Sequence, residues 1–161
     1  MRCLAGLAIL LVVALATGAP AADVRVRAVD AVGLTVSDAG RSLDFYSRVL
    51  CFVPVRDVEV AGASYEELRG VFPVRMRVAR LALGREFLEL TEYLAPRGRP
   101  VPADARANDL VHWQTRLLAG GDALERLARA QPVAVPGHEL GFARGVTVRD
   151  PDGHALEIVE P

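Results

Sequence analysis

The chain has 161 residues, 24% of them charged, and a formal net charge of -1. This length suits one domain with a full core, and the scattered basic residues give no electrostatic footprint for nucleic acid. All 19 basic residues are arginines, which excludes lysine Schiff-base and P-loop chemistry.

The N-terminus has the layout of a secretory signal peptide. Arg2 precedes an apolar run over residues 4–16, and a small-residue cleavage site follows at Ala19-Pro20-Ala21. The run is too short to span a bilayer, which requires about 20 residues. We therefore predict that residues 1–22 are removed and that the mature protein is periplasmic or secreted, without stable membrane insertion. An uncleaved N-terminal anchor is the alternative.

Cys51 remains after this cleavage, whereas Cys3 is removed with the signal peptide. A single cysteine cannot form an intramolecular disulfide. Because its neighbours are Leu50 and Phe52, we expect Cys51 to be a small buried hydrophobic residue, with a reactive thiol as the alternative.

From residue 28 onward, the hydrophobic pattern predicts a strand, a helix and three further strands. Apolar residues at every second position over 32–36 are typical of a half-buried strand. A helix capped by Ser37 or Asp38 follows, with apolar residues at helical spacing over 39–50. The remaining elements of this first module, residues 28–94, are strands at 52–60, 75–83 and 86–93 and a short helical turn at 64–71.

The same order of elements returns after the proline-rich stretch 95–107, which we interpret as a linker or surface loop. The second module, residues 108–161, has predicted strands at 110–118, 132–136, 143–150 and 154–161 and a helix at 121–130. Two tandem βαβββ modules predict a single α+β domain over residues 28–161.

The final hairpin contains the tetrapeptide Asp150-Pro151-Asp152-Gly153, which is typical of a type I turn. His154 follows this turn at the start of a strand, where we expect it to be exposed. His138 lies in a loop flanked by glycine and proline that could overhang a cleft, but we do not expect it to be a ligand.

Strand alternation places two glutamates away from the helices, because successive side chains project to opposite faces of a sheet. The pattern that directs Leu88 and Leu156 toward the helices leaves Glu89 and Glu157 on the other face. If the two sheets curve together, both carboxylates lie in one cleft. Plain solvent exposure of the two glutamates is the alternative. The same face carries Ala31, Gly33, Thr35, Phe87 and Thr91.

Three stretches together, "DAVGLTVSDAGRSLDFYSRVL", "FLELTEY" and "VRDPDGHALEIVEP", resemble the vicinal oxygen chelate superfamily of glyoxalase I, bleomycin-resistance proteins and extradiol dioxygenases. The resemblance spans nearly all of residues 28–161. It implies paired βαβββ modules that form a cup-shaped mixed sheet and accept a small-molecule substrate, and it leaves a homodimer open. Enzymatic members hold a divalent metal such as Zn, Ni, Mn or Fe through His and Glu.

The metal positions carry over from this family only in part. Glu89 in "LEL" and Glu157 in "LEI" match the two glutamate positions, whereas the first-strand histidine position is occupied by Ala31. The second histidine position falls on His112 in one alignment and on Thr115 in another. Alternation favours His112, because Gln114 and Arg116 would then share its polar face.

With Glu89, His112 and Glu157 as metal ligands, the protein would be a lyase, isomerase or dioxygenase acting on a small oxygenated substrate. Glu157 would be catalytic as a proton shuttle. The substrate-binding residues would be Thr35, Phe87 and Arg116.

The missing ligand at Ala31 favours a second hypothesis, a non-catalytic protein that sequesters a small molecule as bleomycin-resistance proteins do. Without a metal, two facing glutamates would repel unless an arginine pairs with them. Arg116 is the predicted partner. A third hypothesis is a protein-interaction module in the periplasm.

Overall fold

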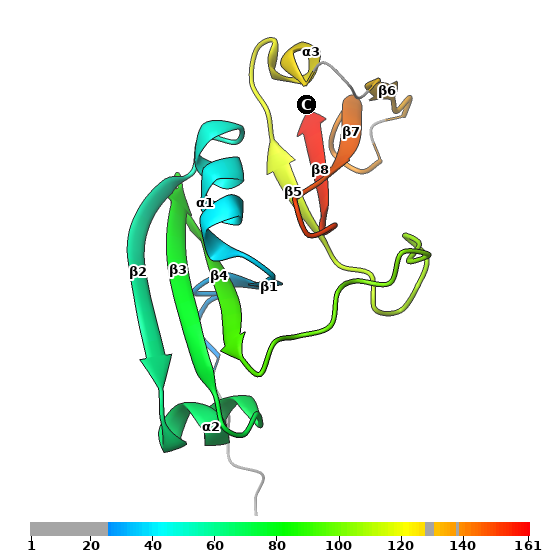
Figure 1. Ribbon diagram of the computed structural model, residues 1–161. Helices are drawn as coiled ribbons and strands as arrows, with labels where there is room; N and C mark the ends of the chain where they lie inside the picture. The colour runs from blue at the N-terminus through cyan, green and yellow to red at the C-terminus, as the bar shows by residue number, and fades with distance from the viewer. Residues whose placement is uncertain (1–25, 128–130, 138) are drawn as a thin grey trace, which may run out of the picture.

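The computed structural model describes residues 26–127, 131–137 and 139–161. The predicted signal peptide and His138 lie outside these ranges. Within them the chain forms an α+β fold with two four-stranded mixed sheets, which confirms the predicted fold class (Figure 1). The two sheets do not close into one barrel. None of the helices in these ranges is long and apolar enough to cross a membrane.

The first sheet has the strand order β1-β4-β3-β2. Strand β1 is parallel to β4, and the other two pairings are antiparallel. This arrangement leaves β1 and β2 as the edges of the sheet. The bounds are β1 Val32–Val36, β2 Val53–Ala61, β3 Arg75–Leu83 and β4 Glu86–Ala95, with helices α1 Ala39–Arg48 and α2 Ala63–Arg69.

The second sheet repeats this topology with the order β5-β8-β7-β6. Strand β5 is parallel to β8, so β5 is an edge strand in the same way as β1. The bounds are β5 Gln114–Leu118, β6 Val133–Ala134, β7 Arg144–Arg149 and β8 Ala155–Glu160, with the short helix α3 Ala123–Arg126.

Strand β5 begins at Gln114, four residues later than predicted. The reason is a turn over the preceding residues, in which the backbone N–H of His112 donates to the carbonyl of Asp109 at 2.9 Å. Trp113 also differs from expectation. Strand alternation that puts His112, Gln114 and Arg116 on one face predicts that Trp113 faces the helix, but Trp113 is 65% exposed.

Helix α1 lies between the two sheets and joins their cores (Figure 1). Its N-cap is Asp38, whose carboxylate accepts from the backbone N–H of Arg41 at 2.9 Å, as predicted for this position. The buried ring of Tyr46 from α1 belongs to the same apolar cluster as Leu34 of β1 and Leu156 of β8. The core therefore couples the position of β8 to that of α1.

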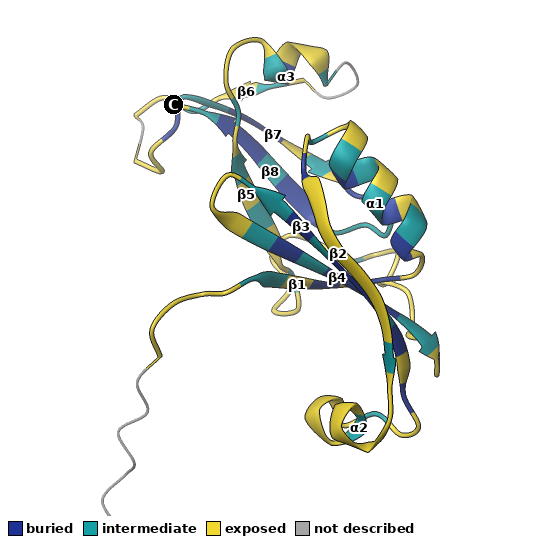
Figure 2. Ribbon diagram, turned by 90° about the vertical axis from the view of Figure 1, so that its left-hand side faces the viewer, coloured by how far each residue is buried: buried dark blue, intermediate teal, exposed yellow. Residues whose placement is uncertain are grey.

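The segment after α1 also departs from prediction. Cys51 is exposed, not buried, and it adopts a left-handed conformation with φ of 61° between α1 and β2. Strand β2 follows as a largely exposed edge (Figure 2). Pro54 and several charged residues lie on this edge, a composition that discourages further strand pairing.

Candidate functional site

Glu157 projects from β8 toward β5, where an arginine neutralises it. Arg116 Nε donates to Glu157 Oε2 at 2.5 Å, and Gln114 Nε2 donates to the same oxygen at 3.3 Å. The guanidinium of Arg116 also stacks over the ring of Phe142, 4.8 Å from its centroid. The predicted partnership of Arg116 with a glutamate is therefore confirmed, as is the shared face of Gln114, Arg116 and Glu157.

Glu89 lies in the middle of β4, opposite Gly33 of β1 and Arg80 of β3. Its Oε1 is 3.8 Å from Arg69 Nη2. Arg80 stacks over Phe87 at 4.3 Å. Like Glu157, this carboxylate lies among arginines.

His112 lies in a different cavity from Glu157, which lines a cavity with Leu140 and Phe142. It precedes β5, is half-buried, and its Nε2 is buried without a hydrogen-bond partner in the described ranges. It lines a small cavity of about 90 Å³ together with Arg149 and His154.

The three predicted metal ligands are thus not brought together. Across the part of the chain that the structure describes, no group of three or more His, Cys, Asp or Glu side chains is placed to hold a metal ion. Arg116 forms an ion pair with the carboxylate of Glu157, and the side chain of Ala31 has no atom that could coordinate a metal. This donor set does not fit a zinc-like transition metal, which is held by three or four converging protein ligands.

A larger cavity, of about 590 Å³, lies between the edge of the first sheet and β5. Phe87 and Ala31 line it from the first sheet, and Trp113, Gln114 and Arg116 line it from the second. Its remaining lining residues are mostly aliphatic: Val29, Val32, Phe52, Leu83, Gly84, Glu86, Leu88, Thr115, Leu117 and Leu118. Two of the three predicted substrate-binding residues, Phe87 and Arg116, therefore share one cavity.

Thr35, the third predicted substrate-binding residue, lies elsewhere. It lines a separate cavity of about 200 Å³ at the other end of β1, with Tyr93, Arg97 and Arg99. This cavity is smaller than ordinary ligand pockets, which occupy roughly 300–1,000 Å³.

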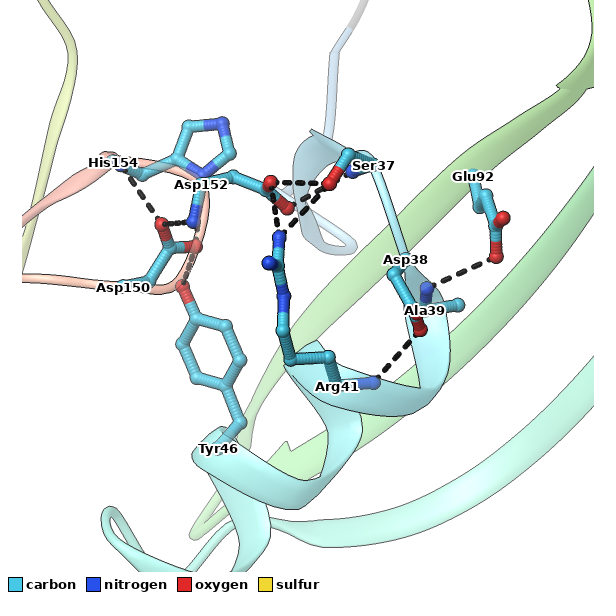
Figure 3. A network of polar contacts seen from close by, with 9 residues as sticks. All are labelled: Ser37, Asp38, Ala39, Arg41, Tyr46, Glu92, Asp150, Asp152 and His154. Atoms are coloured by element: carbon cyan, nitrogen blue, oxygen red, sulfur yellow. Dashed lines mark hydrogen bonds and ion pairs between the residues drawn. The ribbon is translucent and has the colours of Figure 1, made fainter. Parts of the chain in front are cut away.

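A polar network ties the final hairpin to α1 (Figure 3). Asp150 has a buried side chain that accepts from Tyr46 Oη at 3.1 Å and from His154 Nδ1 at 2.8 Å. Its other oxygen accepts from the backbone N–H groups of Asp152 and His154 at 2.9 and 2.8 Å. The predicted turn is confirmed by the hydrogen bond from Gly153 N to the Asp150 carbonyl at 3.0 Å.

A second carboxylate of the same turn reaches the start of α1. Asp152 accepts from the backbone N–H of Ser37 at 2.9 Å, from its hydroxyl at 2.6 Å, and from Arg41 Nη2 at 2.7 Å. The final turn is therefore a polar joint between the β7–β8 hairpin and α1.

The prediction that His154 is an exposed residue was wrong. Its side chain is 19% exposed, because the turn packs against α1. The hydrogen bond to Asp150 raises the pKa of His154 above its usual value. Burial opposes ionisation of Asp150, but the hydrogen bond and charge of His154 outweigh it, so the pKa of Asp150 is lowered. Burial, followed by the charge of Asp150, raises the pKa of Tyr46.

Sequence reasoning missed this network, although one signal was available. Tyr46 falls on the buried face of a predicted helix, and a buried tyrosine hydroxyl requires a hydrogen-bond partner. The final turn supplies that partner in Asp150.

Comparison with known proteins decides the family. The model of the Glyoxalase/Bleomycin resistance protein/Dioxygenase superfamily matches residues 28–158. The chain belongs to this superfamily. Its enzymatic members commonly bind divalent metals, a property that the donor set above does not reproduce. No curated protein matches the chain.

Solved structures support the same fold at low sequence identity. A glyoxalase family protein from Bacillus cereus has a TM-score of 0.71 and 17% identity, covering 87% of this chain and 97% of its own. A glyoxalase family protein from Enterococcus faecalis has a TM-score of 0.54 and 17% identity, covering 83% and 98%. The fosfomycin resistance protein FosX from Mesorhizobium loti has a TM-score of 0.51 and 13% identity, covering 84% and 92%.

Proposed function

We propose that this protein binds a small, mainly apolar molecule in the cavity between β1 and β5, and that it does so without a metal ion. The observation that carries this proposal is the cavity of about 590 Å³ lined by Phe87 and Trp113. Its volume lies within the range of small-molecule pockets, whose walls are mostly apolar with a few polar groups.

The wall offers two kinds of contact to such a ligand. Phe87 and Trp113 provide aromatic faces, and burial of apolar surface against them contributes about 25 cal/mol per Å². Gln114 and Arg116 provide hydrogen-bond donors at one side of the cavity. Because both already bond to Glu157, they are held in place and favour a ligand with an acceptor group at that end.

A metal-dependent lyase, isomerase or dioxygenase would need a different arrangement of the same residues. A metal ion at Glu157 would have to displace Arg116, and His112 would have to leave its own cavity. Sequestration of a small molecule, the mode of the bleomycin-resistance proteins that the sequence resembles, requires neither change. We therefore favour binding without chemistry.

The predicted export completes the proposal. A periplasmic or secreted protein that sequesters a small molecule would act on it before it reaches the cytoplasm. The support for export is the layout of residues 1–22 alone.

Trp113 makes the binding testable, because it is the single tryptophan of the chain and lines the cavity. The probe is 8-anilinonaphthalene-1-sulfonate, titrated in the presence of EDTA and detected by energy transfer from Trp113. We expect saturable binding that Phe87→Ala weakens about tenfold, equivalent to about 1.4 kcal/mol.

The matched control is Tyr65→Ala, which removes an exposed aromatic ring from α2, outside the cavity. It should leave the titration unchanged. Equal weakening by both variants, or binding that EDTA abolishes, would contradict the proposal.

A further inference from the structure

The joint between the final turn and α1 contains a titratable group that the proposed binding site does not use. His154 holds Asp150 from one side, and Tyr46 of α1 holds the same carboxylate from the other. Asp150 is 5% exposed, so a change in its partners cannot be compensated fully by water. The joint links residues more than 100 positions apart in the chain.

Positively and negatively charged groups surround His154. Asp150 is its direct partner, and the carboxylate of Asp152 and the backbone carbonyl of Thr35 also favour the protonated ring. His112, Arg106 and Arg149 also line the small cavity next to His154. The guanidinium of Arg149 is engaged by the carbonyl of Gly153 at 2.6 Å, and Asp152 is paired with Arg41.

A short covalent and hydrogen-bonded route connects this histidine to the ligand cavity. Ala155 directly follows His154 and is the register partner of Gln114, the first residue of β5. Gln114 lines the 590 Å³ cavity. A shift of the turn relative to α1 therefore moves β5, which forms one wall of the cavity, relative to the first sheet, which forms the other.

We propose that His154 is a pH-dependent positioning residue, whose protonated ring fastens the final turn to β1 and α1 and so holds the ligand cavity at its binding width. The inference rests on the proposed binding function. It adds a regulation of that site by the acidity of the surroundings.

The chemistry of the ring explains which contact is lost on deprotonation. A neutral imidazole keeps one N–H, and Asp150 retains it at Nδ1. The other ring nitrogen then loses its proton, and with it the favourable interaction of the protonated ring with the Thr35 carbonyl. The ion pair with Asp150 becomes a hydrogen bond from a neutral ring to the carboxylate, which lacks the attraction between two opposite charges.

The sign of the effect follows from linkage. The folded-state pKa of His154 is raised, so its contribution is complete below the unfolded value, near 6.5, and is lost as pH rises through the folded value. The pKa of Asp150 is lowered, so its contribution is lost in acid. The cavity should bind most tightly between these two limits.

The experiment is the Trp113 energy-transfer titration of the full mature chain between pH 5.5 and pH 9, with the permanently charged sulfonate probe. The affinity of the wild-type protein for the probe should fall about threefold as the pH rises through the folded-state pKa of His154, equivalent to about 0.7 kcal/mol. His154→Asn, which can donate to Asp150 but does not titrate, should give a flat profile. His112→Asn removes the other described histidine and should keep the wild-type profile.

A wild-type pH dependence retained by His154→Asn, or abolished by His112→Asn, would overturn the inference. Absence of probe binding at every pH would instead refute the proposed function. In that case the pH dependence of thermal unfolding tests the joint directly. The wild-type melting temperature should fall more steeply above neutral pH than that of His154→Asn, and equal slopes would overturn the inference.

Discussion

Tyr46→Phe removes one hydrogen bond of the joint while leaving the packing of the ring unchanged. The ring is 1% exposed and makes edge-on contacts with Phe45 and Phe52, with centroids 5.3 and 5.6 Å apart. A phenylalanine preserves these contacts. The hydroxyl donates to a buried carboxylate at 3.1 Å, so its removal leaves Asp150 with one donor fewer.

The expected cost follows from the partners that remain. A hydrogen bond to a charged group contributes about 1.5–3 kcal/mol. Asp150 keeps donors from the backbone of Asp152 and from both the backbone and the ring of His154, which favours the lower end, about 1.5 kcal/mol. For a domain of this size, 1 kcal/mol corresponds to roughly 3–4 °C. Tyr46→Phe should therefore lower the melting temperature by about 5 °C.

Thermal unfolding followed by circular dichroism, supported by urea unfolding at 25 °C, measures this change. The control is Tyr65→Phe, which removes the hydroxyl of an exposed tyrosine on α2, outside the hydrogen-bond network of Asp150. An unchanged melting temperature in Tyr46→Phe, or equal losses in both variants, would refute the role of the joint.

Other predictions concern charge, export and the exposed thiol. Arg116→Met should leave Glu157 without its charged partner and lower the free energy of unfolding by up to about 1 kcal/mol, because the pair is partly exposed; urea unfolding measures it, and an increase in stability would count against the pairing. The mature protein should begin after residue 22 in the periplasm or medium, as mass spectrometry of the fractions can show; an intact cytoplasmic chain would contradict export. Cys51 should react with a thiol reagent in the native protein, since it is exposed, and protection until unfolding would contradict its placement.

Much of the fold could be predicted because its signals are local. Alternation over β1, β4 and β8 located the inward residues, and Leu34, Leu90 and Leu156 are buried as expected. The capping aspartate at 38 and the turn at 150–153 are short motifs with their own hydrogen bonds. These features depend on neighbours in sequence, so the sequence alone defines them.

The candidate site depended on contacts distant in sequence, and there prediction was only partly successful. The pairing of Arg116 with Glu157 followed from strand faces and charge alone. The position of His112 could be predicted only if the first residue of β5 was known. The turn that begins at Asp109 makes the strand start later in the sequence than its hydrophobic pattern indicates. The burial of His154 required knowing that the turn packs on α1. Periodicity reports the face of a strand, but it does not report what lies across that face.

Metal content tests the central claim, a cavity that binds without a metal ion, most directly. The purified mature protein, competent to bind the fluorescent probe, is incubated separately with Zn²⁺, Ni²⁺, Mn²⁺ and Fe²⁺ under anaerobic conditions, desalted, and analysed by mass spectrometry of the elements, with Glu157→Gln as control. We predict metal well below one ion per chain, equal in both proteins, and a probe affinity that the metals do not change. One ion per chain in the wild type, lost in Glu157→Gln, would contradict the account and restore Glu157 as a metal ligand.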